Sequence, residues 1–97
     1  MTSFSEIINK DTPVLVDFFA TWCGPCQTMS PILKAVKDTL GDNVSILKID
    51  VDKNKALASK FQVRGVPTFI LFKNGKQVWK QSGLIQKKEL IQMIQSA

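Results

Sequence analysis

The chain has no histidine and no tyrosine among its 97 residues, and it has only two cysteines. Without histidine it cannot use Ser-His-Asp or Cys-His catalysis, a histidine-ligated metal site or a histidine pH switch. Two cysteines are also too few for the multi-bridge framework of small secreted domains. The cysteine pair is therefore the first candidate for any chemistry.

Long apolar segments are missing as well. The first six residues do not combine a basic start with an apolar run, so we expect no secretory signal. No stretch approaches the roughly 18 apolar residues of a membrane-spanning helix. We therefore expect a cytoplasmic protein in a reducing environment, without a membrane partner.

The net charge of +5 raises the question of nucleic-acid binding. The lysines, however, are scattered from Lys10 to Lys88, and Arg64 is the sole arginine. Arginine is the residue best suited to bidentate contacts with bases and phosphates, and no aromatic residues alternate with a basic run to stack on bases. We interpret the lysines as solvated surface residues and expect no nucleic-acid partner.

The length favours a single domain over residues 1–97, because no repeat, low-complexity tract or linker divides the chain. Apolar patterning predicts helices over 3–10, from the cysteines to Leu40, after Asn54 and over 87–95, and the Asn54 side chain is expected to cap the third of these. It predicts strands over 14–19, 44–51, 69–72 and 77–80, the last two joined by an Asn-Gly turn. This order predicts an α/β fold with a mixed sheet of about four strands and helices on both faces.

The two cysteines are separated only by Gly24 and Pro25, at the junction of a buried strand and a helix. Unpaired backbone N–H groups and the helix dipole at such a junction favour a thiolate. We expect Cys23 to be exposed at the N-cap and Cys26, one turn further, to be more buried. The short spacer lets the two sulfurs form and break a disulfide, with one thiol attacking and the other resolving.

Two other interpretations of the pair stay open at this point. Zinc needs four ligands, and this chain offers two cysteines and no histidine, so a metal site would have to bridge two chains. Alternatively, both cysteines are inert core residues. Within the chain itself we expect no metal site.

The segment 18–26, Phe-Phe-Ala-Thr-Trp-Cys-Gly-Pro-Cys, resembles the active site of the thioredoxin family, and the resemblance continues through 64–68, 72–75 and Gly83. It implies a thioredoxin fold and a monomer. The segment before residue 14 is short for the family, which raises the question of whether the first edge strand is present. Phe19 stands where tryptophan is frequent, and Gln27 where lysine or arginine is frequent.

The resemblance also implies roles for other residues. Asp17, a carboxylate in an apolar strand, is either at a strand end that reaches solvent or a buried acid. The family implies the second, with Asp17 accepting a proton from Cys26 through water and Lys48 moderating its charge. Pro67 matches the family's cis-proline. The implied docking surface for substrate consists of Trp22, Gly24, Pro25, Val66, Pro67 and Gly83, with the Val66 backbone pairing with the substrate.

The implied activity is general protein-disulfide reduction, in which Cys23 attacks and Cys26 resolves. The chain has no GxGxxG dinucleotide motif, so we expect no cofactor and a separate thioredoxin reductase as electron donor. Two alternatives are a thiol oxidase or isomerase on the same fold, and a redox-gated binding subunit.

Overall fold

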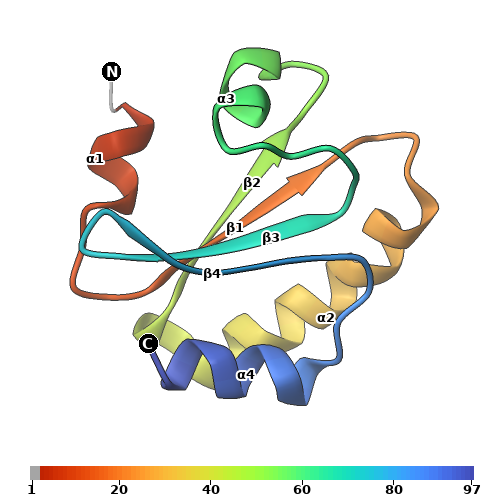
Figure 1. The fold of residues 1–97 in the computed structure, drawn as a ribbon. Helices are drawn as coiled ribbons and strands as arrows, with labels where there is room; N and C mark the ends of the chain where they lie inside the picture. Colours follow the sequence, from red (N-terminus) through yellow and green to blue (C-terminus); the bar gives the residue numbers. More distant parts are fainter. Residues whose placement is uncertain (1–2) are drawn as a thin grey trace.

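The fold is a four-stranded mixed sheet with helices on both faces, in a computed structural model that describes residues 3–97 (Figure 1). The strand order is β2-β1-β3-β4. Along the chain the elements are α1 (Phe4–Ile8), β1 (Val14–Phe19), α2 (Gly24–Leu40), the 3-10 turn η1 (Gly41–Asn43), β2 (Ser45–Asp50), α3 (Lys55–Lys60), β3 (Thr68–Lys73), β4 (Lys76–Ser82) and α4 (Lys87–Gln95). The predicted fold class is confirmed.

Strand β1 lies inside the sheet. It pairs in parallel with β2, because α2 carries the chain back between them, and it pairs antiparallel with β3. Strands β3 and β4 form an antiparallel hairpin. Within residues 3–97 no strand pairs with the outer edge of β2, so the described part of the chain has no additional first edge strand.

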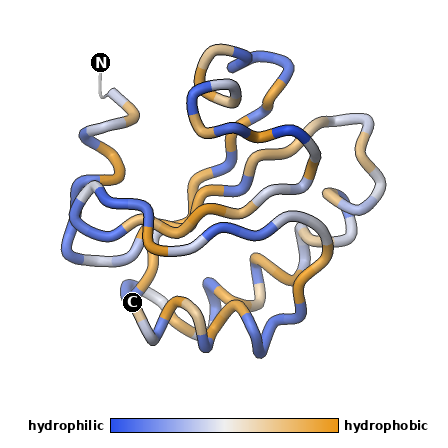
Figure 2. Tube along the Cα trace, viewed as in Figure 1, coloured by the Kyte–Doolittle hydropathy of each residue, from blue (hydrophilic) through white to orange (hydrophobic). Residues whose placement is uncertain are grey.

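The two faces of the sheet carry separate cores because side chains alternate along each strand. Leu15 of β1 packs with the apolar faces of α2 and α4, on one side of the sheet. Val16 and Phe18 pack on the opposite side, where Phe4 of α1 and Phe61 after α3 complete a cluster of aromatic rings. Figure 2 shows that the central strands are hydrophobic and that the turn between β3 and β4 is hydrophilic.

The turn between β3 and β4 has the predicted form. Asn74 and Gly75 both adopt positive φ, at 53° and 79°, as a type I′ turn requires. The N–H of Asn74 also donates to the carbonyl of Lys10, and that of Gly75 to the carbonyl of Ile8. The hairpin is therefore joined to the segment after α1.

The start of α3 differs from the prediction in one respect. Asn54 is the N-cap residue, but its side chain accepts no hydrogen bond from the helix. Its Nδ2 instead donates to the carbonyl of Asp50, 2.9 Å away. The side chain thus closes the turn after β2, and in this orientation it makes no capping bond to the helix.

None of the helices in residues 3–97 is both long enough and apolar enough to cross a lipid bilayer.

Candidate active site

The connection between β1 and α2 places the cysteine pair at a helix N-terminus. Cys23 is the N-cap residue of α2, with extended backbone angles. Its N–H donates to the carbonyl of Ala20, and its sulfur accepts from the N–H of Cys26 at 3.1 Å. Pro25 occupies the first turn, where a missing N–H leaves no helical hydrogen bond unmade. The local sequence, with Cys23 as the N-cap and Pro25 in the first turn, therefore explains why α2 begins at the cysteine pair.

The two cysteines form a disulfide with each other, with 5.3 Å between their Cα atoms. This pairing argues against the interpretation of two inert core cysteines. The expected difference in exposure is wrong, because Cys23 is 4% exposed and Cys26 5%. The reason is tertiary: Cys23 Sγ lies 3.6 Å from the carbonyl oxygen of Val66, whose loop packs against the pair.

The loop before β3 faces the disulfide. The Val66–Pro67 peptide bond is cis. The carbonyl of Pro67 accepts from the N–H of Gly83 at 2.9 Å, which joins this loop to the end of β4. Thr68 Oγ1 donates to the carbonyl of Gly65 at 2.7 Å. Hydrogen bonds on both sides of Pro67 thus fix the loop beside the cysteines.

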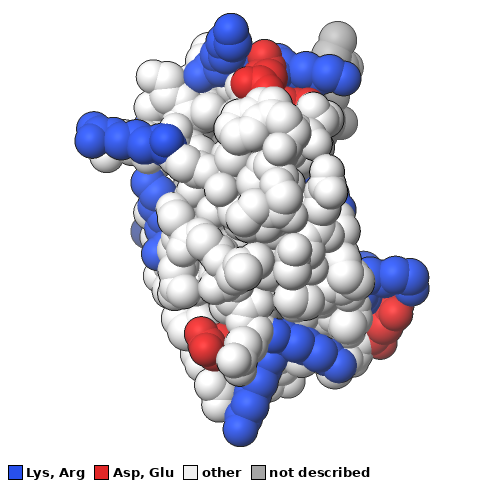
Figure 3. Space-filling view, turned by 90° about the vertical axis from the view of Figure 1, so that its right-hand side faces the viewer, with Lys and Arg blue, Asp and Glu red and all other residues white. Residues whose placement is uncertain are grey.

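The residues expected to form a docking surface are brought to one end of the sheet, with one correction. Pro67 is buried and contributes little surface, because its loop packs against the cysteine pair and is bonded to the end of β4. The exposed area comes from Trp22, Gly24 and Pro25, while Val66 and Gly83 are half-buried. Figure 3 shows the side of the molecule that carries the β1–α2 connection, where a broad uncharged patch is surrounded by charged side chains.

Trp22 is held at the surface by a residue that the sequence analysis did not single out. Its indole is 70% exposed, and Nε1 donates to Asp52 Oδ2 at 2.8 Å. The two residues are 30 positions apart, so no local pattern indicates their contact. This hydrogen bond sets the orientation of the largest exposed apolar side chain beside the disulfide.

Asp17 lies beneath the cysteines as a buried acid. It is 2% exposed, and within residues 3–97 its Oδ1 has no hydrogen-bond partner. A cavity of about 230 Å³ is lined by both Asp17 and Cys26. Burial raises the pKa of Asp17 to about 6, and the positive charge of Lys48 opposes part of that rise. The carboxyl group can therefore hold or release a proton near neutral pH.

Lys48 faces the same cavity as Asp17. The two residues are register partners in the parallel pair of β1 and β2. The Lys48 ammonium donates to Ser30 Oγ of α2 at 3.1 Å, which places it at the cavity wall rather than on the far face of the sheet. Ser30 was not anticipated, because no local pattern links α2 to β2.

The two departures from the family pattern also lie at this cavity. Phe19 is half-buried and lines the cavity. Gln27 lines it too, and its Nε2 donates to the carbonyl of Thr21 at 3.3 Å. Gln27 thus places a neutral, hydrogen-bonded amide at the position where the family frequently has lysine or arginine.

The segment between α3 and the Pro67 loop is held by Lys80 of β4. Its ammonium donates to the carbonyls of Phe61 and Gln62, at 2.9 and 3.1 Å. These carbonyls belong to the C-cap of α3 and the residue after it, where a cation also interacts favourably with the helix dipole. Lys80 therefore stabilises the start of the loop that faces the cysteines.

Replacing Lys80 by methionine keeps the aliphatic stem and removes the ammonium. We expect a loss of roughly 0.5–1 kcal/mol in the free energy of unfolding, since both hydrogen bonds are solvent-exposed. Urea unfolding followed by tryptophan fluorescence measures the change. Lys76→Met in the same strand is the control, and an equal loss in both variants would contradict a specific role of Lys80.

Comparisons with known proteins agree with this geometry. The profile of the family described as Thioredoxin matches residues 1–96. A chloroplastic thioredoxin Y of rice is 50% identical over 97 residues, and a thioredoxin-like protein of Synechocystis is 46% identical over 94. The structure of a mutant thioredoxin from Halobacterium salinarum superposes with a TM-score of 0.89 at 41% identity, covering 99% of this chain and 83% of that one.

The relatives differ in length. The match covers 99% of this chain but 58% of the rice protein, so the chain spans less than two thirds of that relative. The match with the Synechocystis protein covers 96% of this chain and 90% of that protein.

Proposed function

The chain belongs to the thioredoxin family, and on this premise we propose that it reduces protein disulfides by dithiol–disulfide exchange through Cys23 and Cys26. The observation that carries the proposal is the disulfide at the N-terminus of α2, whose second cysteine shares a cavity with a buried carboxyl group. This arrangement combines a stabilised thiolate with a proton acceptor.

The first step starts from the reduced dithiol. The Cys23 thiolate attacks one sulfur of the substrate disulfide, forms a mixed disulfide and expels the other substrate sulfur as a thiolate. Backbone N–H groups at the start of α2 stabilise the negative charge on Cys23 before the attack. The exposed side chains around it, with Trp22 foremost, offer the apolar surface on which the substrate docks.

In the second step, Cys26 loses its proton and attacks Cys23 Sγ. This attack releases the second substrate thiolate and forms the Cys23–Cys26 disulfide, so two electrons have passed to the substrate. Asp17 is the proposed proton acceptor. The cavity that it shares with Cys26 is large enough for water molecules that would relay the proton. The positive charge of Lys48 stabilises the ionised carboxylate and so offsets part of the rise in the pKa of Asp17 that burial causes.

The electron donor and the location are further parts of the proposal. We propose that a thioredoxin reductase regenerates the dithiol, that many protein disulfides serve as substrates, and that the protein works as a monomer in the cytoplasm. Cell fractionation tests the location. Recovery in chloroplasts, the location stated in the rice relative's name, would overturn it.

Insulin reduction tests the activity directly. With NADPH and a thioredoxin reductase, we expect catalytic amounts of the protein to precipitate insulin B chain and consume NADPH. Failure with both this couple and dithiothreitol would overturn the reductase proposal. Faster formation or reshuffling of disulfides in reduced ribonuclease, without insulin reduction, would favour the oxidase or isomerase alternative.

A further inference from the structure

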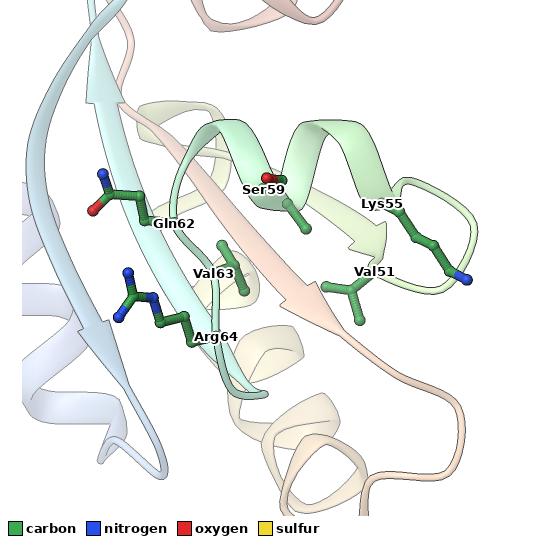
Figure 4. Close-up of a pocket in the computed structure, with 7 residues that line it drawn as sticks. Val51, Lys55, Ser59, Gln62, Val63 and Arg64 are labelled. Atoms are coloured by element: carbon green, nitrogen blue, oxygen red, sulfur yellow. The ribbon is translucent and has the colours of Figure 1, made fainter.

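A hollow of about 400 Å³ lies between α3 and the segment that follows it (Figure 4). Its floor is apolar and consists of Val51, Ala58 and Val63. Polar and cationic side chains complete its wall: Lys55, Ser59, Gln62 and Arg64. The mechanism proposed above uses none of these residues.

The hollow continues toward the surface around the disulfide, which Trp22 and Val66 form. A second hollow of about 140 Å³ is lined by Trp22, Gly65 and Val66, and it shares three residues with the first: Val51, Val63 and Arg64. Val66 contacts Cys23 through its carbonyl oxygen. An extended peptide bound beside Cys23 can therefore continue over Val63 into the hollow at α3.

The charged side chains that line this path are both cationic. Lys55 and Arg64 lie on opposite sides of the hollow (Figure 4), and within residues 3–97 neither takes part in an ion pair or a side-chain hydrogen bond. The acidic residues nearest in sequence, Asp50 and Asp52, do not belong to the lining of either hollow. Asp52 accepts from Trp22, and Asp50 accepts from the N–H of Asp52. In the described part of the chain, residues 3–97, no acidic side chain lines either hollow.

We propose that this joined groove, defined as the two hollows from Trp22 to Lys55, is a specificity subsite for acidic side chains that flank the attacked cysteine of the substrate. The apolar floor accommodates the peptide backbone and stems, and Arg64 and Lys55 attract the carboxylates. The inference rests on the proposed reductase function and names a substrate class within it. Because both cations are exposed, the expected preference is modest, about three- to fivefold in rate constant.

The test uses two disulfide-linked peptides of identical sequence, except that two residues flanking the cysteine are glutamate in one and glutamine in the other. The protein is first reduced with dithiothreitol, which is then removed, so that a single turnover needs no reductase. Tryptophan fluorescence follows the second-order rate constant. We expect the glutamate peptide to react about three- to fivefold faster at low salt, and this ratio to fall toward one at 0.5 M NaCl.

Variants localise the effect. Arg64→Gln and Lys55→Gln should each lower the ratio between the two peptides, and the double variant should bring it to about one. Lys76→Gln is the matched control, since it removes the same charge at the far end of the β3–β4 hairpin. Equal rates for the two peptides, or a ratio that Lys76→Gln lowers as much as Arg64→Gln does, would overturn the subsite. Failure to reduce either peptide would instead overturn the reductase function.

Discussion

Cys23→Ser is expected to abolish disulfide reduction, with a loss on the order of 10³-fold or more in insulin turnover. The serine hydroxyl at the N-terminus of α2 remains protonated at neutral pH, so no nucleophile is available to attack the substrate disulfide. Serine is close in size to cysteine, and it can still accept the N–H bond of Cys26 as an N-cap residue. The fold should therefore persist, which circular dichroism checks.

Cys26→Ser separates the two steps. Cys23 can still attack, but no second thiol releases the substrate, so a mixed disulfide should accumulate. Mass spectrometry and a non-reducing gel detect it, and dithiothreitol should reverse it. Thr28→Ser on the exposed side of α2 is the matched control and should react as the wild type does. Normal turnover by Cys23→Ser, or accumulation of a mixed disulfide on Cys26 of that variant, would contradict the assigned roles.

Asp17→Asn is expected to stabilise the protein at neutral pH and to slow its second step. The folded-state pKa of Asp17 is raised from 3.8 to about 6, so the protonated form is the one that the fold favours. Below about pH 4 the carboxyl is protonated in both the folded and the unfolded state. Between about pH 4 and pH 6 the unfolded chain has released this proton while the folded protein still holds it, so stability falls progressively. The loss is complete above about pH 6, where the folded protein carries a buried charge.

The raised pKa of Asp17 corresponds to a loss of roughly 3 kcal/mol in the free energy of unfolding at pH 7, because a pKa difference of one is worth about 1.4 kcal/mol. Asn cannot ionise, so Asp17→Asn should recover most of this energy at pH 7 and none at pH 4. Urea unfolding at both pH values measures the difference. The exposed Asp42→Asn is the control. A stability difference that is the same at pH 4 and pH 7 would show that ionisation of Asp17 is not its cause.

The same variant should lose activity. Without a proton acceptor in the cavity, deprotonation of Cys26 slows, and we expect about a 10- to 100-fold slower release of the mixed disulfide. The loss should be largest above pH 6, where Asp17 of the wild type is ionised. A pH profile of single-turnover release that coincides with the wild type from pH 6 to 8 would show that another group accepts the proton.

Much of the fold is predictable from local patterns. The periodic residues of α2 and α4 specify these helices directly, since spacing alone sets their buried face, and the continuous apolar run of β1 has the length of a strand buried on both faces. The Asn74-Gly75 turn is equally local, because few residues tolerate positive φ. The capping role of Asn54 was predicted wrongly, since its side chain has a competing acceptor in the preceding turn.

The sequence by itself therefore determined the chemistry of this protein: two cysteines at a strand–helix junction, no histidine, and a carboxylate in an apolar strand. Tertiary structure alone decided how these groups act. It buried both sulfurs against the Val66 loop, put Asp17 and Lys48 on one cavity, joined Trp22 to Asp52, and extended the surface around the disulfide to α3. These contacts join residues tens of positions apart, and burial, which sets the pKa of Asp17, exists only once the chain has folded.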